Sequence, residues 1–136
     1  MTGTPVTVNV IGLGYVGLPL AVALARRFET TGLDIVAARI DELRRGHDRT
    51  GEIEPERLLA STLRLTDNPA QCPPAEFTIV TVPTPIDAAN RPDLTMIEDA
   101  SRTVGAMLPA ACAAGLAPVV IYESTVYPGV TEDICG

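Results

Sequence analysis

The sequence is poor in aromatic residues, although nearly half of it is hydrophobic. Aromatic side chains make up 4% of the 136 residues and tryptophan is absent, while hydrophobic residues of all kinds make up 46%. This scarcity argues against an aromatic-rich all-β core, because small aliphatic side chains suit helices packed closely on a parallel sheet. A chain of this length corresponds to about one domain. The composition therefore favours a single α/β domain.

Positive charge is also scarce. Only 10 Lys and Arg residues stand against 17 Asp and Glu residues, and the net charge is −7. The basic residues are scattered apart from the pairs Arg26-Arg27 and Arg44-Arg45. Proteins that bind nucleic acid present a track of basic side chains to the phosphate backbone. We therefore expect no nucleic-acid partner.

Cysteine and histidine are too few and too widely spaced for a metal site or a disulfide framework. The chain has Cys72, Cys112 and Cys135 without a Cys-x-x-Cys pair, and its one histidine, His47, lies in a polar stretch. Zinc sites need several such ligands at short spacings, and free thiols are typical of a reducing compartment. We expect no metal, no catalytic cysteine in this chain, and a cytoplasmic location.

The uncharged run at residues 6–25 is long enough to cross a membrane, but its composition indicates otherwise. No Lys or Arg precedes it, and Gly12, Gly14, Gly17 and Pro19 would weaken a continuous helix. A buried strand that leads into a buried helix has the same hydropathy. We therefore predict a strand, a turn and a helix here, and no membrane segment.

Strand-like and helix-like patterns alternate along the whole chain. Arg39 and the other charged residues of the second helix are expected to face water, and Thr95 with Glu98 is expected to form a capping box for the last helix. Alternation of this kind implies right-handed parallel crossovers. The predicted fold is a Rossmann-type, doubly wound α/β domain over residues 1–136, with a mostly parallel sheet and three layers. We expect strands at residues 6–11, 30–35, 63–66, 77–82 and 118–123, and helices at residues 16–28, 36–46, 56–61 and 95–108.

The first candidate site is the sequence Gly-Leu-Gly-Tyr-Val-Gly at residues 12–17. It follows the first predicted strand directly and opens the first predicted helix, which is the context in which G-x-G-x-x-G binds a dinucleotide. Gly12 would permit the sharp turn, and Gly14 would let a pyrophosphate approach the backbone N–H groups of the helix N-terminus. Gly17 would let helix and strand pack closely.

A carboxylate at the end of the second strand indicates which dinucleotide binds. Asp34 follows Gly12 by 22 residues, where it can accept hydrogen bonds from both hydroxyls of an adenosine ribose and would repel a 2′-phosphate. NAD is therefore expected rather than NADP. Two alternatives stay open at this stage. Asp34 could cap the next helix, and Arg39 could bind a 2′-phosphate, stack on adenine or pair with solvent.

Polar residues also follow the fourth and fifth predicted strands. Pro83 and Thr84 lie in a Thr-Val-Pro-Thr-Pro segment, and Glu123 and Thr125 lie in Tyr-Glu-Ser-Thr-Val-Tyr-Pro-Gly. Ligands of open parallel sheets bind beyond the carboxyl ends of the strands, so these residues are candidate contacts for the cofactor. Each of them could instead be an ordinary turn residue.

These segments together resemble the amino-terminal region of the UDP-glucose/GDP-mannose dehydrogenase family. The resemblance extends from Val8 to the end of the sequence and is carried by VNVIGLGYVGLPLAVALA, GLDIVAARIDELRRGHD, VTVPTPIDAANRPDLT and VIYESTVYPGVTEDIC. The stretches GHDRTGEIEPE, TPID..NRPDLT and YESTVYPG further resemble the branch that oxidises UDP-N-acetylhexosamines for bacterial surface polysaccharides.

The resemblance implies an activity and a set of roles. The complete enzyme would oxidise the C6 alcohol of a UDP-sugar to a carboxylate with two NAD⁺, through a thiohemiacetal on a cysteine. The catalytic cysteine, the central dimerisation helix and the UDP-sugar-binding domain are expected beyond residue 136, so this fragment should bind NAD(H) without turnover. The full-length enzyme is expected to be a homodimer or larger. The family places Tyr15 and Val16 in the phosphate turn, Asp34 and Arg39 at the adenosine ribose, Thr84 beside the cofactor, and Thr125 near an active-site water.

Two stretches depart from the family pattern, and two other functions stay open. Cys72-Pro73-Pro74 stands where the family usually has a short acidic helix, and residues 109–118 are longer and more apolar than its compact turn before the last strand. The alternatives are the cofactor domain of a β-hydroxyacid dehydrogenase, which shares the glycine turn, and a free-standing NAD(H)-sensing module.

Overall fold

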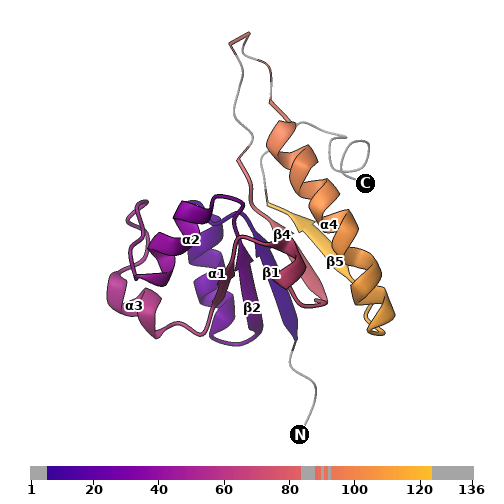
Figure 1. The fold of residues 1–136 in the computed structure, drawn as a ribbon, viewed down its shortest axis with the longest axis horizontal. Coiled ribbons are helices and arrows are strands. Elements are labelled where there is room, and N and C mark those ends of the chain that lie inside the picture. Colours follow the sequence, from indigo (N-terminus) through magenta and orange to yellow (C-terminus); the bar gives the residue numbers. More distant parts are fainter. Residues whose placement is uncertain (1–5, 84–87, 90, 92, 124–136) are drawn as a thin grey trace, which may run out of the picture.

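The computed structural model describes residues 6–83, 88, 89, 91 and 93–123. Within them, five parallel strands form one sheet in the order β3-β2-β1-β4-β5 (Figure 1). The strands are β1 (Thr7–Ile11), β2 (Glu29–Leu33), β3 (Arg64–Thr66), β4 (Phe77–Val80) and β5 (Val119–Tyr122), and the helices are α1 (Gly17–Ala25), α2 (Ala37–Arg44), α3 (Pro55–Ala60), the 3-10 helix η1 (Pro69–Gln71) and α4 (Thr95–Ala113). The chain starts in the middle of the sheet and winds outward in both directions. The doubly wound α/β fold predicted from the sequence is confirmed.

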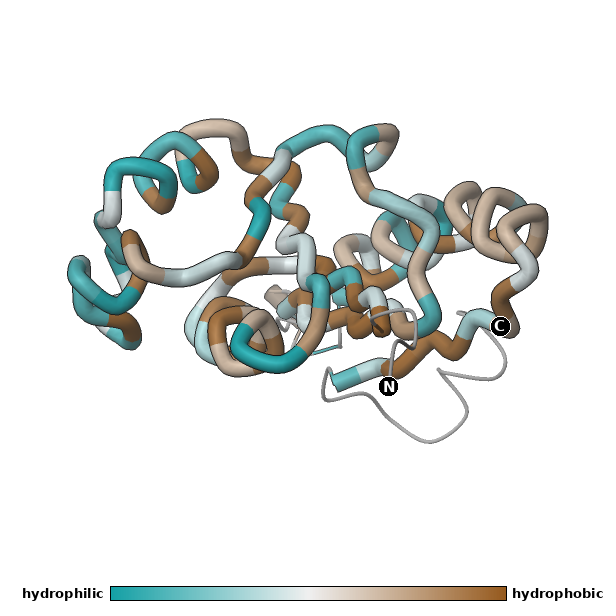
Figure 2. Tube along the Cα trace, turned by 90° about the horizontal axis from the view of Figure 1, so that it is seen from below, coloured by the Kyte–Doolittle hydropathy of each residue, from teal (hydrophilic) through white to brown (hydrophobic). Residues whose placement is uncertain are grey.

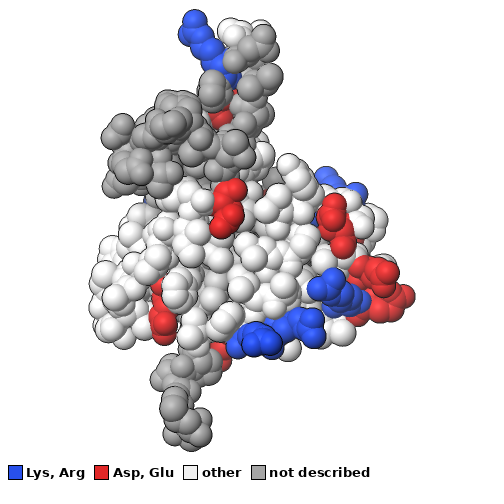
Figure 3. Space-filling model, turned by 180° about the vertical axis from the view of Figure 1, so that it is seen from behind, with Lys and Arg blue, Asp and Glu red and all other residues white. Residues whose placement is uncertain are grey.

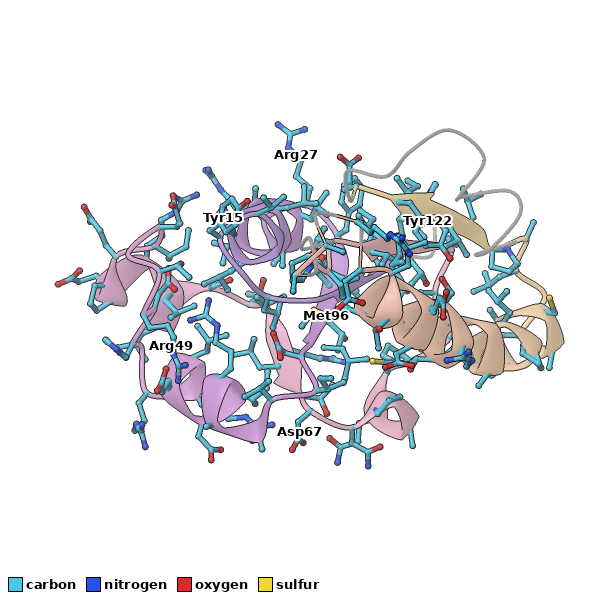
Figure 4. The ribbon with its side chains drawn as sticks, turned by 90° about the horizontal axis from the view of Figure 1, so that it is seen from above. Tyr15, Arg27, Arg49, Asp67, Met96 and Tyr122 are labelled. Atoms are coloured by element: carbon cyan, nitrogen blue, oxygen red, sulfur yellow. The ribbon has the colours of Figure 1, made fainter. Side chains whose placement is uncertain are left out.

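Helices cover both faces of the sheet. α1, α2 and α3 lie on one face, and α4 and η1 lie on the other (Figure 4). Because side chains of a strand alternate between faces, Val8 and Val10 of β1 pack in the cluster under α1, whereas Ile11 packs with Val104 of α4. The hydropathy colouring shows apolar segments in the middle of the molecule and hydrophilic segments more often toward its periphery (Figure 2).

The first helix is short and carries no charged residue. Leu18, Ala21 and Val22 are buried against the sheet, and Pro19 lies in the first turn, where a backbone N–H would have no partner within the helix. The side of the molecule that α1 covers is largely uncharged (Figure 3). Among the residues that the structure describes, no helix is both long and apolar enough to cross a membrane.

The last helix is longer than the sequence indicates. Its buried residues include Ile97, Ala100 and Val104, as predicted, but α4 continues through Pro109 to Ala113 instead of ending before the proline. A proline inside a helix removes the hydrogen bond to the carbonyl four residues earlier. Here that carbonyl belongs to Gly105, which is exposed, so water can replace the missing donor.

The predicted capping box of this helix is wrong. Thr95 is the first residue of α4 rather than the residue before it, and the helix has no side-chain cap hydrogen bond at Leu94. Asp93 instead supplies a side-chain acceptor at the start of the helix, because its Oδ1 accepts a hydrogen bond from the Thr95 N–H at 3.0 Å. The hydrogen bond from Thr95 lowers the pKa of Asp93.

Candidate functional site

The turn between β1 and α1 depends on glycine at its first position. Gly12 has φ of +94°, in the left-handed region that side chains other than hydrogen disfavour. Its N–H donates to the carbonyl of Leu33 at 2.8 Å, and a Cβ added there would lie 3.1 Å from Cγ1 of Val82. Any other residue at this position would therefore be strained in its backbone and would also crowd Val82.

The helix packs directly on this turn because Gly17 has no side chain. A Cβ at Gly17 would collide with the Gly12 carbonyl oxygen and the Thr81 hydroxyl. That hydroxyl donates to the carbonyl oxygens of Gly12 at 2.7 Å and Ile11 at 3.1 Å. Close packing of helix on strand, predicted for Gly17, is what the structure shows.

The start of α1 leaves several backbone donors free. The helix has no side-chain cap at Val16, and the N–H groups of Gly14, Tyr15 and Val16 make no hydrogen bond to another described residue. No heavy atom lies within 4 Å of a Cβ placed on Gly14, and the Tyr15 side chain is 69% exposed (Figure 4). Free N–H groups and the positive end of the helix dipole make this turn suited to an anion such as a diphosphate.

Asp34 lies beside the turn, immediately after β2. Its Oδ2 accepts from the Leu13 N–H at 3.1 Å, and its Oδ1 accepts from the Val36 N–H at 3.0 Å. A carboxylate can accept about four hydrogen bonds, so the half-buried Asp34 can still receive two hydroxyl groups. The structure thus joins Asp34 both to the glycine turn and to the start of the following segment.

Arg39 does not face water, contrary to the prediction for the charged residues of α2. The residue is 5% exposed. Its Nε and Nη2 donate to the Leu13 carbonyl at 2.9 and 2.6 Å, and its Nη1 donates to Asp48 Oδ1 at 3.0 Å. The guanidinium turns inward because the fold supplies both a carbonyl and a carboxylate to receive it, which offsets the cost of burial.

Asp48 has a buried carboxylate, and the sequence analysis did not identify this residue as part of the site. Both its oxygens accept hydrogen bonds from the loop that follows, from Thr50, Glu52 and Ile53. Burial raises the pKa of Asp48, but the hydrogen bonds from Thr50, Ile53 and Arg39 outweigh it and lower the pKa to about 2. The segment Asp-Arg-Thr-Gly at residues 48–51 is typical of an Asx turn, and that signal could have identified Asp48.

The segments after β4 and β5 lie at the same edge of the sheet as the glycine turn. β4 pairs with β1 and with β5 in parallel, and Val80 stands opposite both Ile11 and Tyr122. Beyond these positions, the exposed residues Pro83 and Glu123 follow. Thr84 and Thr125 lie outside the described residues.

The described residues also bear on metal and thiol chemistry. No group of His, Cys, Asp and Glu that could hold a metal ion occurs among them. Cys72 is half-buried and Cys112 is exposed, and both are free thiols; Cys135 lies outside the described part. Burial raises the pKa of Cys72 to about 11, so this thiol is protonated at neutral pH and is a poor nucleophile.

These features fit a dinucleotide such as NAD. The site offers an open glycine, free N–H groups at a helix start and a carboxylate one strand away, all at the carboxyl edge of a parallel sheet. Such an edge is where doubly wound domains bind nucleotides.

Comparison with known proteins agrees with this geometry. The profile described as "UDP-glucose/GDP-mannose dehydrogenase family, NAD binding domain" matches residues 6–136. The UDP-N-acetyl-D-glucosamine 6-dehydrogenase of Pseudomonas aeruginosa is 47% identical over 129 residues, which cover 94% of this chain and 29% of that protein. Protein CapL of Staphylococcus aureus is 43% identical over 128 residues, again 94% of this chain and 29% of the relative.

A solved structure supports the same assignment. The UDP-D-ManNAc dehydrogenase of Pyrococcus horikoshii superposes with a TM-score of 0.80 and 32% identity, over 94% of this chain and 30% of that one. The chain thus spans less than a third of the length of the proteins it matches. The glycine turn, the adjoining carboxylate and the family match over residues 6–136 together show that this chain belongs to the UDP-glucose/GDP-mannose dehydrogenase family, as its NAD-binding domain.

Proposed function

We propose that this chain holds NAD⁺ for a UDP-N-acetylhexosamine 6-dehydrogenase that acts in the synthesis of bacterial surface polysaccharides. Such an enzyme oxidises the C6 alcohol of the sugar to a carboxylate. The NAD⁺ cofactor supplies the oxidising power as a hydride acceptor, and two NAD⁺ are consumed because the conversion removes two hydride equivalents. The substrate class is supported by the 47% identity to a UDP-N-acetyl-D-glucosamine 6-dehydrogenase.

The observation that carries the proposal is that unbonded backbone N–H groups at the start of α1 and the carboxylate of Asp34 occur at the same turn. The N–H groups of Gly14, Tyr15 and Val16 would hold the diphosphate, and Asp34 would accept hydrogen bonds from the adenosine ribose. Asp34 already touches the turn through Leu13, so the two halves of the binding site are mechanically connected.

The remaining contacts belong to the strand ends on the other side of the turn. We assign Pro83, Thr84, Glu123 and Thr125 to the nicotinamide end of the cofactor, because their segments follow strands next to β1 or β4. Thr125 would also position a water molecule near the reacting carbon. Polar groups at such a rim orient the cofactor rather than react themselves.

The chemistry of the sugar requires the part of the enzyme that this chain does not contain. The chain corresponds to 29% of the Pseudomonas relative, and no residue in it is assigned as the nucleophile. The UDP-sugar would bind only when the further domain is present, and the complete enzyme would be a homodimer or larger.

Calorimetric titration tests the cofactor site. NAD⁺ should bind more tightly than NADP⁺, and Asp34→Ala should weaken NAD⁺ binding by roughly 1 to 3 kcal/mol, the usual value of hydrogen bonds to a charged group. Asp41→Ala, at an exposed acidic residue of α2, is the matched control and should bind NAD⁺ normally. Equal affinity of the Asp34 variant and the unaltered chain would refute the assignment.

A turnover assay tests the proposal that this chain binds NAD⁺ but does not oxidise the sugar by itself. With NAD⁺ and UDP-N-acetylglucosamine, the 136-residue chain should produce no sustained NADH absorbance at 340 nm, and the full-length gene product should produce it. Sustained turnover by the chain alone would contradict the proposal.

A further inference from the structure

Asp48 lies in the loop after α2 and is more deeply buried than its loop position suggests. Its side chain is fully buried, and so, to within 6%, is that of Arg39. Asp48 Oδ2 accepts hydrogen bonds from the loop N–H groups of Glu52 and Ile53, at 2.9 and 3.0 Å. Asp48 Oδ1 additionally receives the Arg39 guanidinium at 3.0 Å. One carboxylate therefore serves both the loop and the arginine.

Arg39 links Asp48 to the glycine turn. Two of its nitrogens converge on the single carbonyl oxygen of Leu13, at 2.9 and 2.6 Å. A buried guanidinium that lacks a negatively charged partner is strongly unfavourable. If Asp48 were neutral, Arg39 would gain by moving toward solvent, and it would then release the Leu13 carbonyl.

Leu13 is held from three directions. Its N–H donates to Asp34, its carbonyl accepts from Arg39, and its fully buried side chain lies over Gly32, where a Cβ would meet Leu13 Cδ2 at 2.9 Å. The Leu13 carbonyl and the Gly14 N–H belong to one planar trans peptide and point in opposite directions. Arg39 therefore fixes the direction in which the Gly14 N–H points.

We propose that Asp48 is a positioning residue for the dinucleotide, which acts through Arg39 and the Leu13 carbonyl to aim the Gly14 N–H at the bound diphosphate. This inference rests on the proposed function of the turn. It assigns a role in cofactor affinity to a residue that, within the described part of the chain, makes no hydrogen bond of its own to Gly12, Leu13 or Gly14.

The test compares two variants of the same loop in the 136-residue chain. Asp48→Asn removes the negative charge that holds Arg39. Thr50→Val, the control, removes the hydroxyl that donates to Asp48 Oδ1 at 2.6 Å and leaves the contact with Arg39 intact. Both variants weaken the loop, but only Asp48→Asn should free the Leu13 carbonyl from Arg39.

We expect Asp48→Asn to raise the Kd for NAD⁺ about tenfold, as expected for loss of one well-placed hydrogen-bond donor, and Thr50→Val to change it less than about twofold. In an Arg39→Met background, Asp48→Asn should have no further effect, because the two residues act in series. An unchanged Kd in Asp48→Asn, or an undiminished effect in the Arg39→Met background, would overturn the proposal.

A second measurement needs no cofactor. Amide hydrogen exchange at Leu13, whose N–H donates to Asp34, should accelerate in Asp48→Asn and not in Thr50→Val. If the unaltered chain failed to bind NAD⁺, the proposed function would be wrong, while this exchange experiment would still decide whether Asp48 controls the turn. If Asp48→Asn proved unfolded, Arg39→Met takes its place, because Asp48 keeps its bonds to Thr50, Glu52 and Ile53; an unchanged NAD⁺ affinity in that variant would refute the proposal.

Discussion

Gly14 and Gly17 lie in the same turn, and alanine at each of them should have opposite consequences. At Gly17, the added methyl group would meet the Gly12 carbonyl oxygen and the Thr81 hydroxyl at distances that real side chains do not adopt. At Gly14, it would meet nothing within 4 Å. The first substitution challenges the fold, and the second challenges only a ligand that approaches the turn.

The size of each effect follows from how far the neighbours can move. The Gly12 backbone is fixed by its hydrogen bond to Leu33 at 2.8 Å, so Gly17→Ala should lower the free energy of unfolding by about 3 kcal/mol, the upper end for overpacking. Gly14→Ala should change it by less than about 0.5 kcal/mol, as is usual at open surface positions. Its Kd for NAD⁺ should nevertheless rise about tenfold or more, because a methyl group would stand where the diphosphate approaches the backbone.

Urea denaturation followed by circular dichroism and calorimetric titration with NAD⁺ measure the two quantities separately. If Gly17→Ala were as stable as the unaltered chain, the close packing of α1 on the turn would be incorrect. If Gly14→Ala bound NAD⁺ normally, the diphosphate would have to bind somewhere other than this helix start.

Two further predictions concern ionisation. The pKa of Asp48 falls from 3.8 to about 2 on folding, so this residue stabilises the fold by about 2 kcal/mol above pH 4 and loses that contribution as the pH falls toward 2. Between pH 7 and pH 2.5, urea denaturation should therefore show a smaller loss of unfolding free energy in Asp48→Asn than in the unaltered chain. An equal loss in the two proteins would refute the role of the ionised carboxylate. Burial raises the pKa of Cys72 to about 11, whereas Cys112 is exposed, so a thiol reagent at pH 8 should label Cys112 well before Cys72 in peptide mass spectra, and equal rates would contradict the burial of Cys72.

The sequence alone determined the strand, turn and helix around residues 12–17 and the carboxylate that accompanies them. These features are local: β-branched residues precede the glycines, apolar residues at helical spacing follow, and Asp34 stands where the next strand ends. The alternation of such units was enough to predict the doubly wound sheet, because parallel strands joined by helices have few possible topologies.

The tertiary structure alone decided where Arg39 points. The pattern of its own helix predicts one more charge on the surface, and only the folded chain brings the Leu13 carbonyl and Asp48 within hydrogen-bond distance of it. The continuation of α4 through Pro109 likewise depends on context, because an exposed Gly105 carbonyl can be satisfied by water. Local pattern fixes which segments are helix or strand, whereas the burial of a charge depends on partners from other segments that reach it only when the chain has folded.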